Sequence, residues 1–470
     1  MHIKFCGAAR YVTGSAHLIT LDNGFKILLD CGLFQGKGEE TWPKNNQWLF
    51  KPEEIDCLVL SHAHIDHCGR IPKLVKDGYK GPIHATHATR SLCAVMLMDS
   101  AKIQETDVAW YNDRIIKKKR KSRGPLREPL YTTDDIGPAM VRFEGHPYDK
   151  WQPIHPDVQV LFRDAGHILG SASVTLKIRE NGKEIMLGFT GDIGRPDRPI
   201  LRDPVPMPEV DYLICESTYG DRLHEKTPEQ SDEFLAVIRE ACVDKKGKLL
   251  IPAFSLGRTQ EIIYMLDKMA TRKLLPPIKV YVDSPLAVNV TNIFQLHPEC
   301  FDDEINRYIR TDPNPFGFNN LIYVKDVVSS KSINTSKEPC IIISAAGMMN
   351  AGRSKHHLFN SVDNPKNTIL IVGYCSPETP GGILRSGAKT IRIFDEDKSV
   401  NASIRIMDSF SGHGDRDEML KFISNQQGHV KKIFLVHGEP EVQDNFKTFL
   451  IEQGMGMVDI PTMGQEVLLE

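Results

Sequence analysis

The most chemically distinctive stretch of the chain is a run of histidine and aspartate side chains, His62-x-His64-x-Asp66-His67. Imidazole and carboxylate groups are the donors that Zn, Mn or Fe take in proteins. In a tight loop, His62 and His64 can point one way while Asp66 and His67 point another, which forms two neighbouring groups of donors. A solvated polar turn would not need three imidazoles so close together. The spacing therefore predicts a site for two divalent metal ions.

Two metal ions need more donors than this loop holds, and further polar side chains follow predicted strands elsewhere. His167 follows a strand at 158–162, Asp192 follows one at 184–189, and His437 closes one that begins at 433. Each of these residues alone is typical of a hydrogen-bonded loop. Their shared placement at strand ends, where functional groups collect in layered α/β folds, makes them candidate ligands.

The elements that must position these residues change in pattern along the chain. The first 215 residues predict short apolar strands between Gly-rich turns, at 25–29, 57–60, 158–162, 173–178, 184–189 and 212–215. From about residue 220, strands at 249–251, 278–282, 340–344 and 368–372 alternate with helices such as 258–269. That alternation is typical of an α/β domain with a largely parallel sheet. After about residue 396 the first pattern returns, with strands at 404–407 and 433–436 and a helix at 441–452.

The simplest domain organisation is one domain interrupted by another. Residues 1–220 and 396–470 would form the first domain, and residues 221–395 an inserted α/β domain. The length of 470 residues leaves room for both. Hydrophobic residues at 41% and charged residues at 25% exclude a disordered chain, a collagen-like repeat and a small disulfide scaffold.

Targeting signals and cysteine usage predict a cytoplasmic protein with no membrane partner. The N-terminus has no apolar signal region, and no apolar run approaches the roughly 18 residues that span a bilayer. The ten cysteines include no C-x-x-C pair, so free and mostly buried thiols are expected. A net charge of −3 does not by itself indicate a nucleic-acid partner.

The chain resembles a known family in the order of its motifs. The shared features are Asp30, the motif at 62–67, Gly-His167 and Gly-Asp192, which resemble the metallo-β-lactamase hydrolases, an αββα sandwich. The rest resembles the β-CASP branch, which includes RNase J and the nuclease subunit of the cleavage and polyadenylation specificity factor. Glu216, His413, His437 and the segments 252–261, 344–353 and 373–385 carry that second resemblance. It extends over essentially the whole chain.

The resemblance implies which residues hold which metal. One ion would take His62, His64 and His167, and the other Asp66, His67 and His437, with Asp192 bridging both. Asp30 would not bind a metal itself but would orient the loop histidines that do. The ions implied are two divalent cations, zinc or else manganese.

The resemblance also implies an activity, metal-dependent hydrolysis of RNA. A hydroxide activated by two metals would cleave the phosphodiester bond and leave a 5′-phosphate and a 3′-hydroxyl. With Asp66 and Asp192 at the metals, His413 would protonate the leaving oxygen while Glu216 orients it. His437 favours RNA, because DNA-repair relatives carry an apolar residue there. Endonuclease and 5′-exonuclease action both stay open, and so does a homodimer.

Arginines beside glycines are candidate contacts for RNA phosphates. Arg258, Arg353 and Arg385 each lie in or next to a Gly-containing loop of the inserted domain. Glycine lets backbone N–H groups approach a phosphate, and Arg binds it bidentately. A structural salt bridge beside a turn is an equally good explanation. The basic run from Lys117 to Arg123 is either an outer phosphate track or a solvated face.

Three other functions compete with an RNA nuclease. A small-molecule metallohydrolase, such as a thioesterase or lactonase, shares the loop motif but needs neither the inserted domain nor the Glu216–His413 pair. A non-catalytic scaffold would have degraded ligands, whereas this set is intact. A DNA nuclease of the same branch is disfavoured only by His437.

Overall fold

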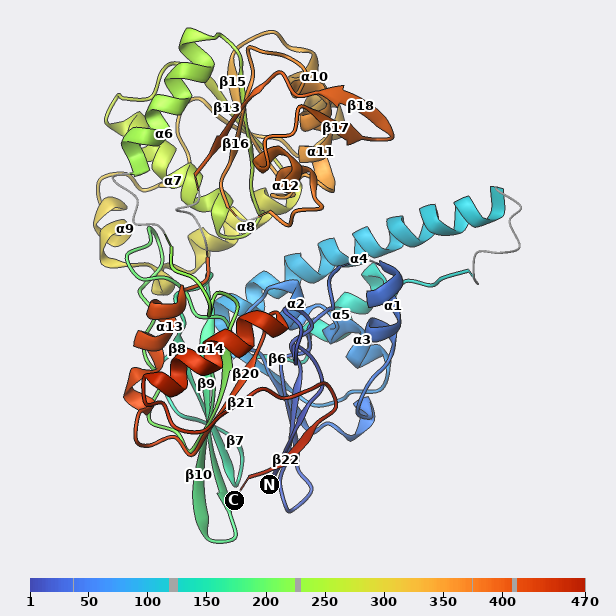
Figure 1. Cartoon of the computed structure of the whole chain (residues 1–470), viewed down its shortest axis with the longest axis vertical. Coiled ribbons are helices and arrows are strands. Elements are labelled where there is room, and N and C mark those ends of the chain that lie inside the picture. Colours follow the sequence, from blue (N-terminus) through green and yellow to red (C-terminus); the bar gives the residue numbers. More distant parts are fainter. Residues whose placement is uncertain (37, 118–125, 225–229, 374, 408–411, 470) are drawn as a thin grey trace. The chain divides into compact units, whose positions relative to one another are not determined.

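The chain folds into two units, each with its own sheets and core (Figure 1). The computed structural model describes residues 1–36, 38–117, 126–224, 230–373, 375–407 and 412–469. Met1–Leu223 and His413–Glu470 form the first unit, and His224–Gly412 the second. Residues 118–123 of the basic run lie outside the described residues.

The first unit is built on two seven-stranded sheets. The first sheet runs in the order β22-β1-β2-β3-β4-β5-β6, with β22 (Glu466–Leu468), β1 (His2–Phe5), β2 (His17–Thr20), β3 (Lys26–Leu29), β4 (Cys57–Val59), β5 (Ile83–Thr86) and β6 (Phe143–His146). The second runs in the order β21-β20-β11-β10-β9-β8-β7, with β21 (Val458–Asp459), β20 (Lys432–Val436), β11 (Tyr212–Glu216), β10 (Lys183–Phe189), β9 (Ala172–Glu180), β8 (Val158–Asp164) and β7 (Gln152–His155).

The two sheets are held together by one apolar core. Phe5 and Ile27 of the first sheet belong to the same buried cluster as Phe162, Phe189 and Phe434 of the second. Alternate side chains of a strand point to opposite faces, so the other face of each sheet needs its own cover.

Helices cover both outer faces, which gives four layers (Figure 1). Over the second sheet lie α13 (Arg416–Ile423) and α14 (Pro440–Glu452), where Phe422 and Phe446 share a buried cluster with Leu213 and Ile433. On the side of the first sheet lie α1 (Gly38–Asn46), α2 (Ile65–Cys68), α3 (Ile71–Lys76), α4 (His87–Lys117) and α5 (Ile136–Met140). The expected αββα sandwich is confirmed.

The second unit is built on a six-stranded parallel sheet, as the alternation of strands and helices predicted. Its order is β14-β13-β15-β12-β16-β19, with β14 (Leu321–Tyr323), β13 (Lys279–Asp283), β15 (Cys340–Ser344), β12 (Lys248–Pro252), β16 (Thr368–Ile371) and β19 (Ser403–Ile406). Around it lie α6 (Gln230–Ile238), α7 (Arg258–Thr271), α8 (Pro285–Leu296), α9 (Asp303–Tyr308), α10 (Val327–Thr335), α11 (Gly352–Ser361) and α12 (Pro380–Arg385). A separate hairpin joins β17 (Thr390–Ile393) to β18 (Glu396–Ser399).

The structure differs from the sequence-based boundaries in where the second unit ends. We expected the first domain to resume at residue 396, and so assigned the strand near 404–407 to it. In the structure that strand, β19, pairs in parallel with β16 of the second unit, which extends to Gly412. An apolar strand sequence does not reveal which sheet edge it will join, because the pairing is set by tertiary contacts.

The cysteines and the helices were the subject of two further predictions. All ten cysteines are free and buried, as their scattered spacing predicted. Among the described residues, no helix is both long and apolar enough to cross a membrane.

Candidate metal centre

The loop that follows β4 carries four of the predicted ligands. His62 and His64 precede α2, and Asp66 and His67 lie within its single turn. Backbone N–H groups of Ser15 and Cys31 donate to the carbonyls of Asp66 and His67, at 2.8 Å each. A Cβ at Gly32 would lie 1.6 Å from the Asp66 carbonyl oxygen, so only glycine permits this approach. Backbone hydrogen bonds and close backbone packing therefore hold this loop in place without a metal ion.

The remaining predicted ligands follow strands of the second sheet. His167 lies between β8 and β9, Asp192 follows β10, and His437 follows β20. His437 has a φ of 54°, and Asp30, which follows β3, has a φ of 58°. Non-glycine residues rarely adopt this left-handed conformation, and such positions cluster at functional sites.

The first cluster brings together donors of His62, His64, His167 and Asp192. His64 Nδ1 lies 3.2 Å from His62 Nε2 and 3.2 Å from His167 Nε2. Asp192 Oδ2 lies 3.3 Å from His62 Nε2 and 3.5 Å from His167 Nε2. Four donors from three separate loops thus converge on one point.

The second cluster brings together donors of Asp66, His67 and His437. His437 Nε2 lies 3.1 Å from His67 Nε2 and 3.4 Å from Asp66 Oδ2. The other oxygen of Asp192, Oδ1, lies 3.2 Å from His67 Nε2 and 3.7 Å from His437 Nε2. Asp192 therefore faces one cluster with each carboxylate oxygen.

These donor sets fit a pair of divalent cations. Donors that surround zinc tetrahedrally at about 2.0–2.2 Å lie about 3.3–3.6 Å from one another, close to the separations found here. Asp192 is 2% exposed, and its Oδ1 accepts no hydrogen bond. A buried carboxylate oxygen without a donor is costly unless a cation faces it.

Asp30 fixes the tautomers of two loop histidines. Its Oδ2 accepts hydrogen bonds from His67 Nδ1 at 2.7 Å and from the hydroxyls of Ser15 and Ser61 at 3.0 Å. Because Ser61 Oγ donates to Asp30, it accepts from His62 Nδ1, 3.0 Å away. Both rings thus keep a proton on Nδ1 and turn Nε2 to the clusters.

Burial and charge set the protonation of the centre. In the first cluster, burial lowers the pKa of the imidazoles of His62, His64 and His167. The pKa of His64 falls to about 3. Burial alone would also lower the pKa of His67 and His437. The neighbouring carboxylates, led by Asp192, outweigh burial, so the net pKa of each is raised. Burial alone would raise the pKa of Asp66 and Asp192, but nearby imidazoles outweigh burial and hold both pKa values below the usual range. The first cluster is ready to bind a cation, whereas the second must release protons to do so.

Glu216 and His413 form a pair beside the first cluster. His413 Nδ1 lies 3.2 Å from Glu216 Oε2, and its Nε2 lies 4.0 Å from Asp192 Oδ2. Burial lowers the pKa of His413, but Glu216 outweighs it and the net value is raised to about 9. Glu216 Oε1 accepts from the backbone N–H of Ile193, next to Asp192. The second ring nitrogen of His413 therefore faces the metal centre.

Sequence reasoning missed Thr218, which follows β11. Its Oγ1 donates to Glu216 Oε2 at 2.6 Å and lies 3.0 Å from His437 Nδ1. Because the hydroxyl donates to Glu216, it accepts from His437 Nδ1, and His437 Nε2 faces the second cluster. Its position two residues after Glu216 was the only available signal.

The three arginines expected to contact RNA already have partners within the second unit. Arg258 is buried, and its Nη1 lies 2.8 Å from Glu261 Oε2. Arg353 Nη1 lies 2.5 Å from Asp283 Oδ1, and Arg385 Nη1 donates to the Gly373 carbonyl at 3.2 Å. Contact with RNA stays a prediction for all three.

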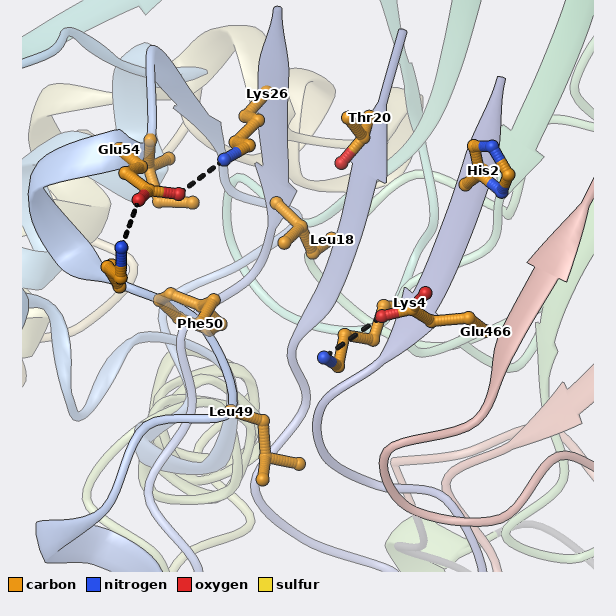
Figure 2. A pocket seen from close by; sticks show the side chains of 11 residues that line it. His2, Lys4, Leu18, Thr20, Lys26, Leu49, Phe50, Glu54 and Glu466 are labelled. Carbon is orange, nitrogen blue, oxygen red and sulfur yellow. Dashed lines mark hydrogen bonds and ion pairs between the residues drawn. The ribbon is translucent and has the colours of Figure 1, made fainter. Parts of the chain in front are cut away.

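A pocket on the first sheet lies away from this centre (Figure 2). Its lysine and glutamate side chains are paired with one another: Lys4 with Glu466 at 3.0 Å, and Lys26 and Lys51 with Glu54 at 2.5 and 2.7 Å. None of the predicted ligands lines it. The pocket is not part of the metal centre.

Three family models match the chain. They are described as the metallo-beta-lactamase superfamily at residues 10–214, the Beta-Casp domain at 259–384, and a Zn-dependent metallo-hydrolase RNA specificity domain at 397–461. The third begins close to the expected boundary at 396, although β19 packs with the second unit.

Curated relatives match over nearly the whole chain. Ribonuclease TTHA0252 of Thermus thermophilus is 34% identical over 94% of this chain and 94% of its own length. The transcription termination factor FttA of Methanocaldococcus jannaschii is 32% identical, over 93% and 67%. The cleavage and polyadenylation specificity factor 73 of Drosophila melanogaster is 31% identical, over 96% and 61%.

Proposed function

This chain belongs to the metallo-β-lactamase superfamily and carries its Beta-Casp domain, and from that premise we propose that it is a metal-dependent ribonuclease. The products expected are a 5′-phosphate and a 3′-hydroxyl. One observation carries the proposal: Asp192 turns one oxygen to each of two donor clusters, and His413 lies beside them.

The metals proposed are two zinc ions. His62, His64 and His167 would hold one, Asp66, His67 and His437 the other, with Asp192 shared by both. Nitrogen-rich donor sets suit zinc, and the matching specificity domain is described as Zn-dependent. When bound, two such ions supply a water of lowered pKa and positive charge opposite the phosphate.

The protein's own contribution to bond cleavage comes from His413. With Nδ1 held by Glu216, the ring turns Nε2 toward the centre and can deliver a proton there to the leaving 3′-oxygen. Thr218 keeps the Glu216 carboxylate in place and so positions His413 indirectly. Asp30 holds His67 and, through Ser61, His62.

RNA is the proposed substrate, because two of the relatives are a ribonuclease and a cleavage and polyadenylation factor. Arg258, Arg353 and Arg385 would contact its phosphates.

The proposal is tested by the products formed from end-labelled RNA. The zinc- or manganese-loaded protein is incubated with one RNA carrying a 5′-triphosphate or a 5′-monophosphate, and with DNA of the same sequence. We expect RNA fragments that bear 5′-phosphates and 3′-hydroxyls. A ladder of internal cuts would identify an endonuclease, and dependence on the 5′-end an exonuclease.

Two outcomes would overturn the proposal. Cleavage of the DNA with the RNA left intact would assign the chain to a DNA nuclease. No cleavage of either polymer, together with hydrolysis of a thioester or lactone, would make it a small-molecule hydrolase.

A further inference from the structure

A second group of metal-binding side chains lies outside the centre described above. It consists of His84 on β5 and Glu144 and His146 on β6. The two strands are parallel, and their register pairs His84 with Glu144 and Thr86 with His146. Residues two apart on a strand share a face, so this register brings the three side chains together.

His84 Nδ1 lies as close to the other two donors of this group as the donors of the metal centre lie to one another. His84 Nδ1 lies 3.0 Å from His146 Nε2 and 3.5 Å from Glu144 Oε2. In the metal centre the matching separations run from 3.1 Å, between His67 and His437, to 3.7 Å, between His437 and Asp192.

A single ring proton cannot bond all three donor atoms of this group to one another. A neutral His84 carries at most one proton on Nδ1, yet that atom faces both His146 Nε2 and a carboxylate oxygen. If His146 donates instead, the lone pair of His84 Nδ1 faces the carboxylate, which also offers only lone pairs. A cation among the three atoms would satisfy all of them at once.

Burial keeps both imidazoles in the form that binds metals. His84 is 3% exposed. Burial lowers the pKa of His84 to about 4 and also lowers that of His146. Both rings are thus neutral at neutral pH, and no imidazolium proton takes the place of a cation.

We propose that His84, Glu144 and His146 bind a third divalent metal ion, zinc by the type of their donors, which ties the edge strand β6 to β5. The site shares no residue with the proposed nuclease centre, so it does not depend on that proposal. The Glu144 carboxylate is 58% exposed, which gives the ion a route from solvent. Three protein donors would leave one coordination position of a tetrahedral zinc ion for water, so the bound ion would exchange with zinc in solution.

The test counts zinc ions in the full-length protein. Chelator-stripped protein is loaded with Zn²⁺, freed of excess metal, and analysed by mass spectrometry of the elements. We expect H146Q to bind one zinc ion per chain fewer than the natural sequence. H429Q serves as the control, because His429 is an exposed histidine paired with Glu209, and it should bind the full number.

Two more variants separate this site from the nuclease centre. D192N should lose zinc from the centre and keep the ion at His84. E144Q, whose side chain is exposed, should preserve the fold and weaken the third site about tenfold or more. Equal zinc content in the natural protein, H146Q and E144Q would overturn the proposal and leave the group as a hydrogen-bonded histidine pair.

Discussion

The histidines of this chain differ in what their ring nitrogens meet. His62, His67 and His437 each keep Nδ1 on an acceptor and turn Nε2 to a neighbouring donor set. His413 turns Nδ1 to Glu216. His17, in contrast, is buried between Phe5 and Phe189, with no hydrogen-bond partner on either nitrogen. In the proposed centre the same residue type would thus serve as ligand and as proton donor, whereas His17 is a core residue.

Removing His413 should separate chemistry from metal binding. We expect His413→Ala to keep its zinc content and lose about 10²–10⁴-fold in the rate of RNA cleavage, because only the proton donor is missing. Single-turnover cleavage and zinc analysis on the same preparation measure both quantities. A folded, zinc-loaded variant that cleaves at the original rate would contradict this role.

Replacing His17 should change the acid stability. Burial lowers its pKa to about 3, whereas the unfolded chain binds that proton near pH 6.5. The unfolded state therefore holds more protons below pH 6.5, and stability is lost as the pH falls from there towards 3. We expect His17→Leu to lose about 2 kcal/mol less than the natural protein between pH 7 and pH 5, as measured by urea unfolding. Equal losses would show that His17 does not contribute.

At the scale of elements, the start of α13 holds the loop that carries His413. Asp415 accepts hydrogen bonds from the backbone N–H groups of Asp417 and Glu418, and Glu418 bonds back to the N–H of Asp415. Gly414 N–H donates to the Ile193 carbonyl at 2.8 Å, next to Asp192. The capped helix therefore fixes His413 beside the metal ligands.

Removing this cap should lower stability and cleavage together. We expect Asp415→Ala to cost about 1 kcal/mol and to reduce the cleavage rate while the zinc content stays unchanged. Asp415→Asn keeps a capping oxygen and should behave like the natural protein. Thermal unfolding and cleavage assays on both variants measure the difference; identical behaviour of the two would contradict the role of the cap.

The strands and helices that the sequence predicted are present in the structure, but other elements, β5 and β6 among them, and the pairing of the strands were not predicted. The strands and helices predicted lie within two residues of those observed, because apolar runs bounded by turn residues define them locally. The motif at 62–67 indicated where the candidate metal centre lies, because its donor types and their spacing are local features of the sequence. The group at His84 was not predicted, because Glu144 and His146 reach it only through the parallel pairing of β5 with β6. The roles of Thr218 and β19 likewise depend on distant partners.

At the scale of the whole molecule, two cores coexist in one chain. The clusters of the first unit and that of the second share no residue. Every predicted metal ligand lies in the first unit, within 1–223 or 413–470. Metal binding should therefore stabilise the first unit alone.

Chelation should accordingly loosen only part of the chain. We expect a chelator to speed amide hydrogen exchange around α2, in the loop between β8 and β9 and after β20, because these segments supply the ligands. The strands β12, β13 and β15 should exchange at unchanged rates. Mass spectrometry of peptides resolves these regions, and equal loosening of β12 would contradict the separation.

The most direct test of the account is the cleavage of one labelled RNA by matched preparations of the natural protein and Asp192→Asn. We predict that the metal-free natural protein is inactive and that zinc restores cleavage. The folded variant should stay inactive with or without zinc, because both clusters lose their shared carboxylate. Cleavage by the metal-free protein, or by the variant at the natural rate, would contradict a two-metal ribonuclease centred on Asp192.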